Sequence, residues 1–153
     1  MIKNVFAFAL LLFLLVACSK VPVGFLKTED ASYKPSKVYA YHEVEEGTPW
    51  SKGAPFTSTE IQGLAGTPPI SFEFLSVRAT DGGSEAKFLE AVRSGGVQLR
   101  GSYIQLFPEA AKTLPHGIYT ISLKVYNEDH SATLNDVFAF VVKKAPEDGD
   151  DEL

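Results

Sequence analysis

The chain has 153 residues, with 14 Lys and Arg against 19 Asp and Glu, which gives a net charge of −5 at neutral pH. This acidic balance, with the lysines scattered along the chain, excludes the basic stripe that a nucleic-acid-binding surface requires. The chain has a single cysteine, so an intramolecular disulfide is excluded as well, and the length fits one domain.

The first 17 residues have the pattern of an export signal. Lys3 is followed by an apolar run without charge from Val5 to Val16, which corresponds to the basic and hydrophobic parts of a signal peptide. This run is shorter than the roughly 20 apolar residues that a membrane-spanning helix needs. We therefore expect residues 1–17 to be removed rather than retained.

A short motif follows the apolar run. Leu15, Val16, Ala17 and Cys18 resemble the lipobox of bacterial lipoproteins, in which small or apolar residues precede an obligatory cysteine. The resemblance implies that Cys18 receives a diacylglycerol, becomes the new N-terminus and is then open to N-acylation, for example with palmitate. Two or three buried acyl chains hold a protein on a bilayer at about 0.8 kcal/mol per methylene. The alternatives are an ordinary signal peptide with an incidental cysteine, or an uncleaved hydrophobic segment.

The next part of the chain changes from a polar segment to strands. Residues 18–37 are polar, contain two prolines and show no apolar period, which predicts a flexible tether. A strand is expected over residues 38–44, with Tyr39 and Tyr41 on one face. Residues 70–79 predict a further strand, in which the apolar phase slips by one residue near Leu75, as a β-bulge would cause.

The second half of the chain predicts one helix and four strands. Ser84 to Arg93 is the helical candidate, with an apolar face made of Ala86, Leu89 and Val92. Two short strands are expected over residues 97–100 and 103–107, about a turn at residues 101–102. Strict alternation from residue 117 to 127 predicts a half-buried strand, and residues 136–143 predict its hairpin partner across a long loop, 128–135.

Six or seven short strands, with Gly and Pro in the connections, predict an all-β fold. We expect a β-sandwich over residues 38–144 with at most one short helix. Residues 145–153 are expected to form a disordered acidic tail, because five of the last seven residues are acidic: Glu147, Asp148, Asp150, Asp151 and Glu152. These carboxylates lack the looped spacing of a Ca²⁺ site.

The run from Leu114 to Val125 carries a resemblance to a known class of module. Leu114, Pro115, Gly117 and Tyr119 fit the Leu-Pro-x-Gly-x-Tyr pattern that often opens the penultimate strand of immunoglobulin-like and cadherin-like extracellular modules, and residues 66–83 add to the likeness. Together with the lipobox, the chain is similar to Bacteroidetes-type lipoproteins with one such module, including small accessory lipoproteins of polysaccharide-utilisation systems.

The resemblance implies an immunoglobulin-like β-sandwich that is anchored by lipid at the bacterial outer membrane. The spaced Asp and Asn residues that bind Ca²⁺ in cadherins are missing. The acidic signal that follows the cysteine in surface-exposed members is also absent, since Cys18 is followed by Ser19, Lys20, Val21 and Pro22. Whether the periplasmic or the surface face holds the domain is left open.

The sequence contains no recognisable set of catalytic groups. The three histidines, His42, His116 and His130, lie in different segments without metal-ligand spacing, and we expect the last two to be solvated loop residues. No stretch fits phosphate binding, and no nucleophile and base form a recognisable pair. We therefore predict a protein that is not an enzyme and that binds no metal or cofactor.

Aromatic residues are the remaining candidates for a site. Trp50, the only tryptophan, lies in the loop 48–53, and Tyr39 and Tyr41 lie on the strand before it. Flat rings with polar groups suit a sugar-binding surface; alternatively, Trp50 caps the sandwich edge and the tyrosines are ordinary strand residues. The sequence favours a non-catalytic binding or accessory lipoprotein, for glycan or an envelope protein. The alternative is an assembly protein that binds another envelope protein through a sheet edge.

Overall fold

The computed structural model describes residues 24–147 and residue 150, and these residues form a mostly β domain, as predicted. The larger sheet has four strands in the order β2 (Lys37–Tyr41), β9 (Ser131–Lys143), β8 (Gly117–Tyr126) and β5 (Ser71–Thr80). β2 runs parallel to β9, while the other pairs are antiparallel. The predicted signal peptide and Cys18 lie outside the described residues.

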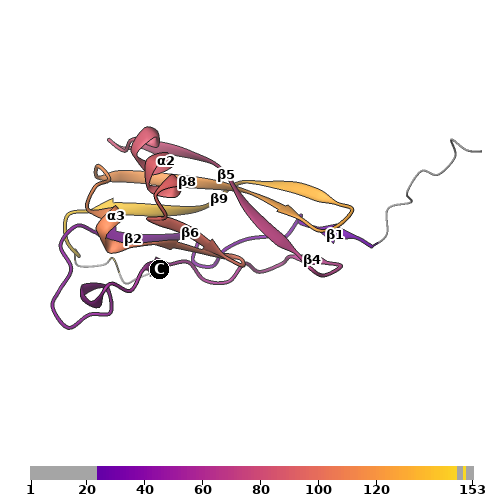
Figure 1. Ribbon diagram of the computed structural model, residues 1–153, viewed down its shortest axis with the longest axis horizontal. Helices are drawn as coiled ribbons and strands as arrows, with labels where there is room; N and C mark the ends of the chain where they lie inside the picture. The colour runs from indigo at the N-terminus through magenta and orange to yellow at the C-terminus, as the bar shows by residue number, and fades with distance from the viewer. Residues whose placement is uncertain (1–23, 148–149, 151–153) are drawn as a thin grey trace, which may run out of the picture.

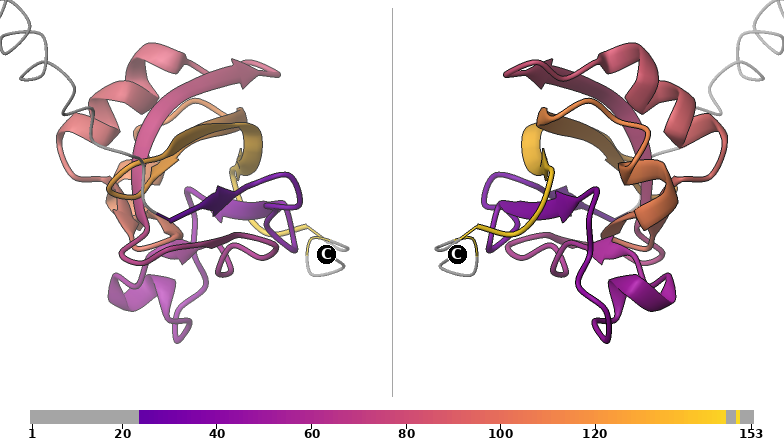
Figure 2. Two further views of the ribbon diagram at one scale, coloured as in Figure 1. Left: turned by 90° about the vertical axis from the view of Figure 1, so that its right-hand side faces the viewer. Right: turned by 90° about the vertical axis from the view of Figure 1, so that its left-hand side faces the viewer.

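A second sheet faces the first. It has three strands in the order β3 (Phe56–Thr57), β7 (Tyr103–Leu106) and β6 (Val97–Arg100), and a small sheet pairs β1 (Leu26–Lys27) with β4 (Ala65–Gly66) at one end of the elongated domain (Figure 1). The apolar core lies between the two larger sheets. Viewed along the long axis, the helix α2 (Glu85–Arg93) lies beside β5, and the loop that carries the 3₁₀ turn η1 (Trp50–Lys52) projects on the opposite side (Figure 2).

β8 forms the centre of the larger sheet and confirms the predicted alternation. Tyr119, Ile121, Leu123 and Val125 are all fully buried. Such alternation arises because successive side chains of a strand point to opposite faces of the sheet. The predicted bulge in β5 is confirmed too, since the pairing with β8 shifts between Phe74 and Ser76.

The predicted helix is present as α2 (Glu85–Arg93), but it buries a different face. The Ser84 hydroxyl caps it by accepting the backbone N–H of Lys87 at 3.4 Å. Phe88 and Ala91 are the buried residues of α2, rather than Ala86 and Leu89. Phe88 decides the orientation because its ring has the largest apolar surface to bury.

The prediction of at most one helix is wrong. A single α-helical turn, α3 (Pro108–Ala111), and a 3₁₀ turn, η1 (Trp50–Lys52), are also present. Pro108 stands at the first position of α3 and Glu109 follows it. Proline at this position is favoured because its fixed φ suits a helix start, where the missing N–H has no helical partner.

The hairpin of β8 and β9 is tighter than predicted. Strand β9 begins at Ser131, because the side chain of Asn127 accepts the N–H groups of Asp129 and His130 and closes a short turn. The expected long loop, residues 128–135, is therefore mostly strand. A large bulge interrupts β9. Leu123 pairs with Leu134 but Ile121 pairs with Phe138, so three residues of β9 lie opposite Ser122.

Asp136 lies at the centre of this bulge. Its φ is +48°, and its N–H donates to the Ser122 hydroxyl at 2.9 Å. Its carboxylate accepts a hydrogen bond from Arg78 of β5 at 2.7 Å. The extra residues of β9 are therefore held by specific polar contacts, which the alternation of apolar residues does not reveal.

Residues 24–37 lie against the domain, where the sequence predicts a tether. Tyr33 is only 2% exposed, its ring packs edge-on against Phe138 at 5.2 Å between centroids, and its hydroxyl donates to the carbonyl of Ser102. Ser32 and Gln62 exchange backbone hydrogen bonds of 2.9 and 2.8 Å. One aromatic side chain among polar residues has no periodicity, so the pattern of this segment does not indicate its burial. Over residues 24–147 and residue 150, no helix is long and apolar enough to cross a membrane.

Candidate functional site

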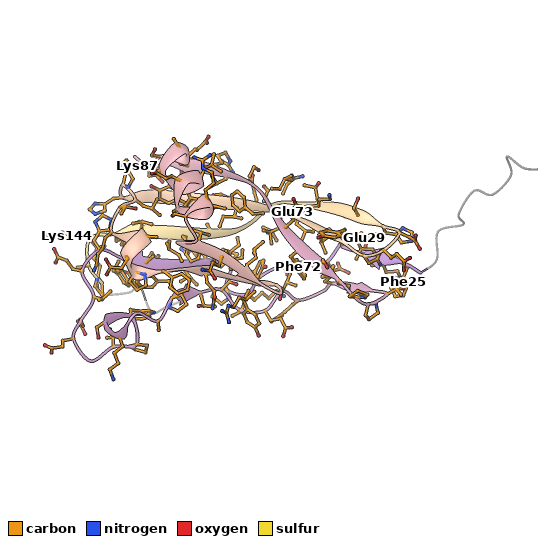
Figure 3. All side chains as sticks on the ribbon, viewed as in Figure 1. Phe25, Glu29, Phe72, Glu73, Lys87 and Lys144 are labelled. Atoms are coloured by element: carbon orange, nitrogen blue, oxygen red, sulfur yellow. The ribbon has the colours of Figure 1, made fainter. Side chains whose placement is uncertain are left out.

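The three predicted aromatic residues lie around one groove of about 480 Å³ at the end of the domain that is remote from Phe25. Figure 3 labels Phe25 at one end of the domain and Lys144 at the other. Lys144 stands two positions before Pro146, which lines the groove. The groove is lined by residues of β2, of the loop that carries η1 and of the C-terminal segment: Val38, Tyr39, Tyr41, Val44, Glu45, Thr48, Trp50, Pro146 and Asp150.

Trp50 is fixed by the local structure of its loop. It begins the turn η1 directly after Pro49, and the turn ends at Gly53, whose φ of +88° suits glycine. The indole stacks on the buried ring of Phe56, with centroids 5.3 Å apart and an angle of 23° between the planes. Trp50 is therefore half-buried, because one part of it packs on the core while another part lines the groove.

Tyr41 connects the groove to the core. It is 5% exposed and packs edge-on against both Trp50 and Phe56, with ring centroids 6.5 and 6.1 Å apart. Its hydroxyl donates to a carboxylate oxygen of Asp150 at 3.0 Å. The predicted residue thus combines a packed ring with a polar group that is aimed at the groove.

A lysine and two acidic residues complete the site. Lys143, the last residue of β9, donates to Asp150 at 2.7 Å and to Glu147 at 2.9 Å. The hydrogen bond that Lys143 donates to Asp150 is the main reason that the pKa of Asp150 is lowered. The bonds that Lys143 donates to Asp150 and Glu147 raise its own pKa above the ordinary value. Both groups are therefore charged at neutral pH.

Tyr39 lies beside two ammonium groups. The Nζ atom of Lys143 is 4.8 Å from the centre of the Tyr39 ring, and that of Lys37 is 5.5 Å away. Both distances allow a cation–π attraction. The groove therefore offers aromatic faces, a phenol and a fixed positive charge, which are groups that bind and orient a ligand.

The C-terminal segment differs from the disordered tail that the sequence predicts. Asp150 is 8% exposed and the backbone N–H of Glu147 donates to its carboxylate at 3.0 Å. The remaining positions of that segment, 148–149 and 151–153, lie outside the described residues. An acidic composition predicts a solvated segment, but it does not indicate that one carboxylate, Asp150, is hydrogen-bonded to Lys143 at the end of a strand.

Two of the three histidines, which lie in different segments of the sequence, come together in the structure. His42 is hydrogen-bonded through Nε2 to the carbonyl of Leu114 at 2.8 Å, and its Nδ1 lies 3.2 Å from Nε2 of His116. A carbonyl only accepts, so Nε2 of His42 donates to Leu114, and the Nδ1 of a neutral His42 ring accepts a hydrogen bond from Nε2 of His116. Within the described part of the chain, no group of three or more His, Cys, Asp or Glu residues could hold a metal ion.

A second hollow, of about 580 Å³, lies between α2 and α3. It is lined mainly by polar and small residues, among them Lys87, Glu90, Glu109 and Thr113. Its wall has one aromatic residue, Phe107, and no buried charged side chain. The aromatic groove is the better candidate because several kinds of binding group converge there.

Lys143 and Asp150 are the site residues that sequence reasoning missed. The alternation in β9 does place Lys143 opposite in phase to the buried residues Phe140 and Val142, which indicates an outward side chain. No local pattern indicates that β2 pairs with β9 in parallel and aligns Tyr41 with Lys143. Comparison of the chain with protein-family models, curated proteins and solved structures gives no match.

Proposed function

We propose that this chain is a lipid-anchored, non-catalytic binding module with an immunoglobulin-like β-sandwich, and that the groove of Tyr39, Tyr41 and Trp50 binds glycan. The observation that carries the proposal is the convergence of these three rings in one groove, with Lys143 in contact with two of the lining residues, Tyr39 and Asp150. Aromatic rings with a few convergent polar groups are typical of small-ligand sites.

Strand order supports the immunoglobulin-like part of the proposal. In such domains one sheet contains strands B, E and D, and the other contains G, F and C. If β3, β5, β6, β7, β8 and β9 are strands B to G, the sheets have the orders B-E-D and G-F-C, and β2 is added beside G. The chain has one cysteine, at position 18, so the disulfide of antibody domains is not shared.

Tyr119 adds a second argument. It lies near the start of β8 and its hydroxyl donates to the carbonyl of Pro115, four residues upstream, at 2.7 Å. A tyrosine near the start of strand F that bonds back to the upstream backbone is the tyrosine corner of immunoglobulin-like sandwiches. The contact accounts for the Leu-Pro-x-Gly-x-Tyr pattern, since Pro115 supplies the acceptor and Tyr119 the donor.

The position of Gly24 agrees with anchoring through Cys18. Six residue steps from Cys18 to Gly24 span at most about 20 Å. A lipid on Cys18 would keep the end of the domain with Phe25, which is 49% exposed, near the bilayer. The groove would then face away from the membrane, because it lies at the opposite end (Figure 3). An outer-membrane location is part of this proposal, with either face possible.

The anchor is tested by membrane fractionation of Cys18→Ser. We expect the variant to move to the soluble fraction and to lose the added mass of the acyl chains. Ser19→Ala is the matched control, and it should stay with the membrane. Retention of Cys18→Ser in the membrane with an unchanged N-terminal mass would exclude the lipid anchor.

Glycan binding is tested by calorimetric titration of residues 19–153 with a panel of oligosaccharides. For the oligosaccharide that binds, Trp50→Ala and Tyr39→Ala should each weaken binding about tenfold or more, since loss of a central aromatic anchor costs about 1.4 kcal/mol or more. Tyr103→Ala, which removes a 40% exposed ring that does not line the groove, is the control. Circular dichroism checks that each variant is folded. No binding across the panel, or equal binding by the groove variants, would refute the glycan proposal.

Assembly through a sheet edge is a second candidate, because β5 forms an edge of the larger sheet and Leu75 in its bulge is 48% exposed. A partner would pair with the free side of β5. Co-purification from membranes should recover a partner with wild-type protein and with Leu89→Lys, but lose it with Leu75→Lys. Recovery of no stable partner, or the same partner with Leu75→Lys, would exclude this function.

A further inference from the structure

We infer that Asp150 occupies the subsite in which the groove recognises a carboxylate, so that the ligand is an acidic glycan containing uronic acid and the C-terminal segment competes with it. This inference rests on the proposed function of the groove as a glycan site. It adds the charge class of the glycan and an intramolecular competitor.

The contacts of Asp150 describe a carboxylate site. One oxygen accepts from Lys143 at 2.7 Å, and the other accepts from the Tyr41 hydroxyl and from the N–H of Glu147, both at 3.0 Å. The Asp150 side chain is 7% exposed. Charge-assisted bonds to a largely buried carboxylate are the stronger class of hydrogen bond, so this subsite selects an anion over a neutral group.

Two of these three donors belong to the sheet and not to the C-terminal segment. Tyr41 ends β2 and Lys143 ends β9, and the two residues are aligned in the parallel pair. Their backbone positions do not depend on Asp150, because β2 pairs with β9 up to Tyr41 and Lys143, and β9 pairs with β8 up to Val142 on its other side. The third donor, the N–H of Glu147, leaves with the segment. The subsite therefore exists independently of the residue that fills it.

The contacts that compete with a ligand are few. Asp150 is only seven positions after Lys143, so its effective concentration at the subsite is high. Glu147 pairs with Lys143 while its own side chain is 72% exposed. Exposed ion pairs contribute little, so Asp150 itself is the main contact that a competing carboxylate has to replace.

A uronic acid fits the groove better than other carboxylates. Its ring presents an apolar face that stacks on Trp50 or Tyr39 while its carboxylate takes the position of Asp150 beside Lys143. The two rings and the subsite line the same groove, whose volume of about 480 Å³ is in the range of small-ligand sites. An acidic peptide shares the carboxylate but lacks a sugar ring with an apolar face at a fixed distance from it.

The test compares oligogalacturonate with the same oligosaccharide after reduction of its carboxyl groups, titrated into residues 19–153 by calorimetry. If the segment fills the subsite in about 90% of molecules, the apparent Kd is about tenfold weaker than the intrinsic one. Asp150→Asn and a chain that ends at Pro146 should therefore bind oligogalacturonate about tenfold more tightly than wild type. Lys143→Gln should weaken binding by a similar factor, while the matched control Lys144→Gln, at an exposed lysine paired with Glu43, should not.

Each alternative result has a distinct meaning. Equal affinity of wild type and both Asp150 variants, or the same gain for the reduced oligosaccharide, would overturn the inference. Tight binding of a hexa-aspartate peptide in place of oligogalacturonate would also overturn it. If neutral oligosaccharides bind and Trp50→Ala abolishes this binding, the proposed function stands while the inference fails. If no glycan binds to any variant, both fail.

Discussion

Replacement of Tyr119 by Phe is the sharpest test of how the domain is held together. The Tyr119 hydroxyl donates to the carbonyl of Pro115 at 2.7 Å and accepts the backbone N–H of Ser84 at 3.2 Å. It therefore joins the start of β8 to the residue that caps α2. The substitution removes one oxygen and leaves the ring, which stacks on Phe88 with centroids 5.2 Å apart.

The expected loss follows from these two bonds. A neutral hydrogen bond contributes about 1 kcal/mol net, and a buried group that loses its partner costs about 1–3 kcal/mol. Water can reach the carbonyl of the half-buried Pro115 in the variant, so this carbonyl regains a partner and the loss stays below the upper limit. We therefore expect Tyr119→Phe to lower the free energy of unfolding by about 2 kcal/mol. For a domain of this size the midpoint of thermal unfolding should fall by roughly 8 °C.

Urea unfolding followed by Trp50 fluorescence and by circular dichroism measures this change. The midpoint should fall at an unchanged m-value, because the surface exposed on unfolding is the same. Tyr103→Phe, at a ring that is 40% exposed, is the control and should stay within about 0.5 kcal/mol of wild type. A Tyr119→Phe variant as stable as this control would refute the structural role of the hydroxyl.

Three further predictions concern other parts of the domain. Gly117→Ala should lower the free energy of unfolding by about 1–3 kcal/mol in urea titrations, because its Cβ atom would lie 2.5 Å from the backbone nitrogen of Gly83; wild-type stability would contradict the close approach. Burial raises the pKa of Tyr33 above its ordinary value of 10.0, so the contribution of Tyr33 to the free energy of unfolding should be fully present below pH 10 and decrease as the pH rises above it. Tyr33→Phe should therefore lose less stability at alkaline pH than wild type; an equal loss in both proteins would argue against this. The lowered pKa of Asp150 means that its contact is present at neutral pH and lost as the pH falls through that pKa, so Trp50 fluorescence should change with acid in wild type but not in Asp150→Asn, and identical titrations would count against the contact.

Features that depend on local periodicity could be predicted from the sequence. The alternation of apolar residues in β8 follows from the geometry of a single strand, and so does the slip at Leu75 in β5. The position of the helix is also a local signal, since it is predicted over Ser84 to Arg93 and found over Glu85–Arg93. These predictions hold because each needs only the residues within one element.

Features that depend on distant partners could not be predicted. Phe88 fixes the face of α2 because it packs against Phe74 and Tyr119, which are far away in the sequence. Tyr33 is buried by Phe138, and no apolar period surrounds it. The bulge in β9 depends on Ser122 in the neighbouring strand.

The same division applies to the candidate site. Tyr39 and Tyr41 could be placed on one side of a strand, and Trp50 follows in the next loop, so their convergence was open to prediction. Lys143 and Asp150 enter through the parallel pairing of β2 with β9. Parallel partners are separated by a long stretch of chain, and no motif in either strand specifies the other.

Strand β9 has a mechanical consequence. It begins at Ser131, beside a turn whose His130 contacts the backbone of Gly24 at 3.1 Å, and ends at Lys143, which contacts the groove residue Asp150. Its 13 residues cover about 40 Å at roughly 3.3 Å per residue. If the groove binds a ligand as proposed, a pull between that ligand and Gly24 would be directed along the domain and therefore nearly along this strand. The hydrogen bonds that join β9 to β8 and β2 run across that direction, so they would be loaded in shear and many would have to break together.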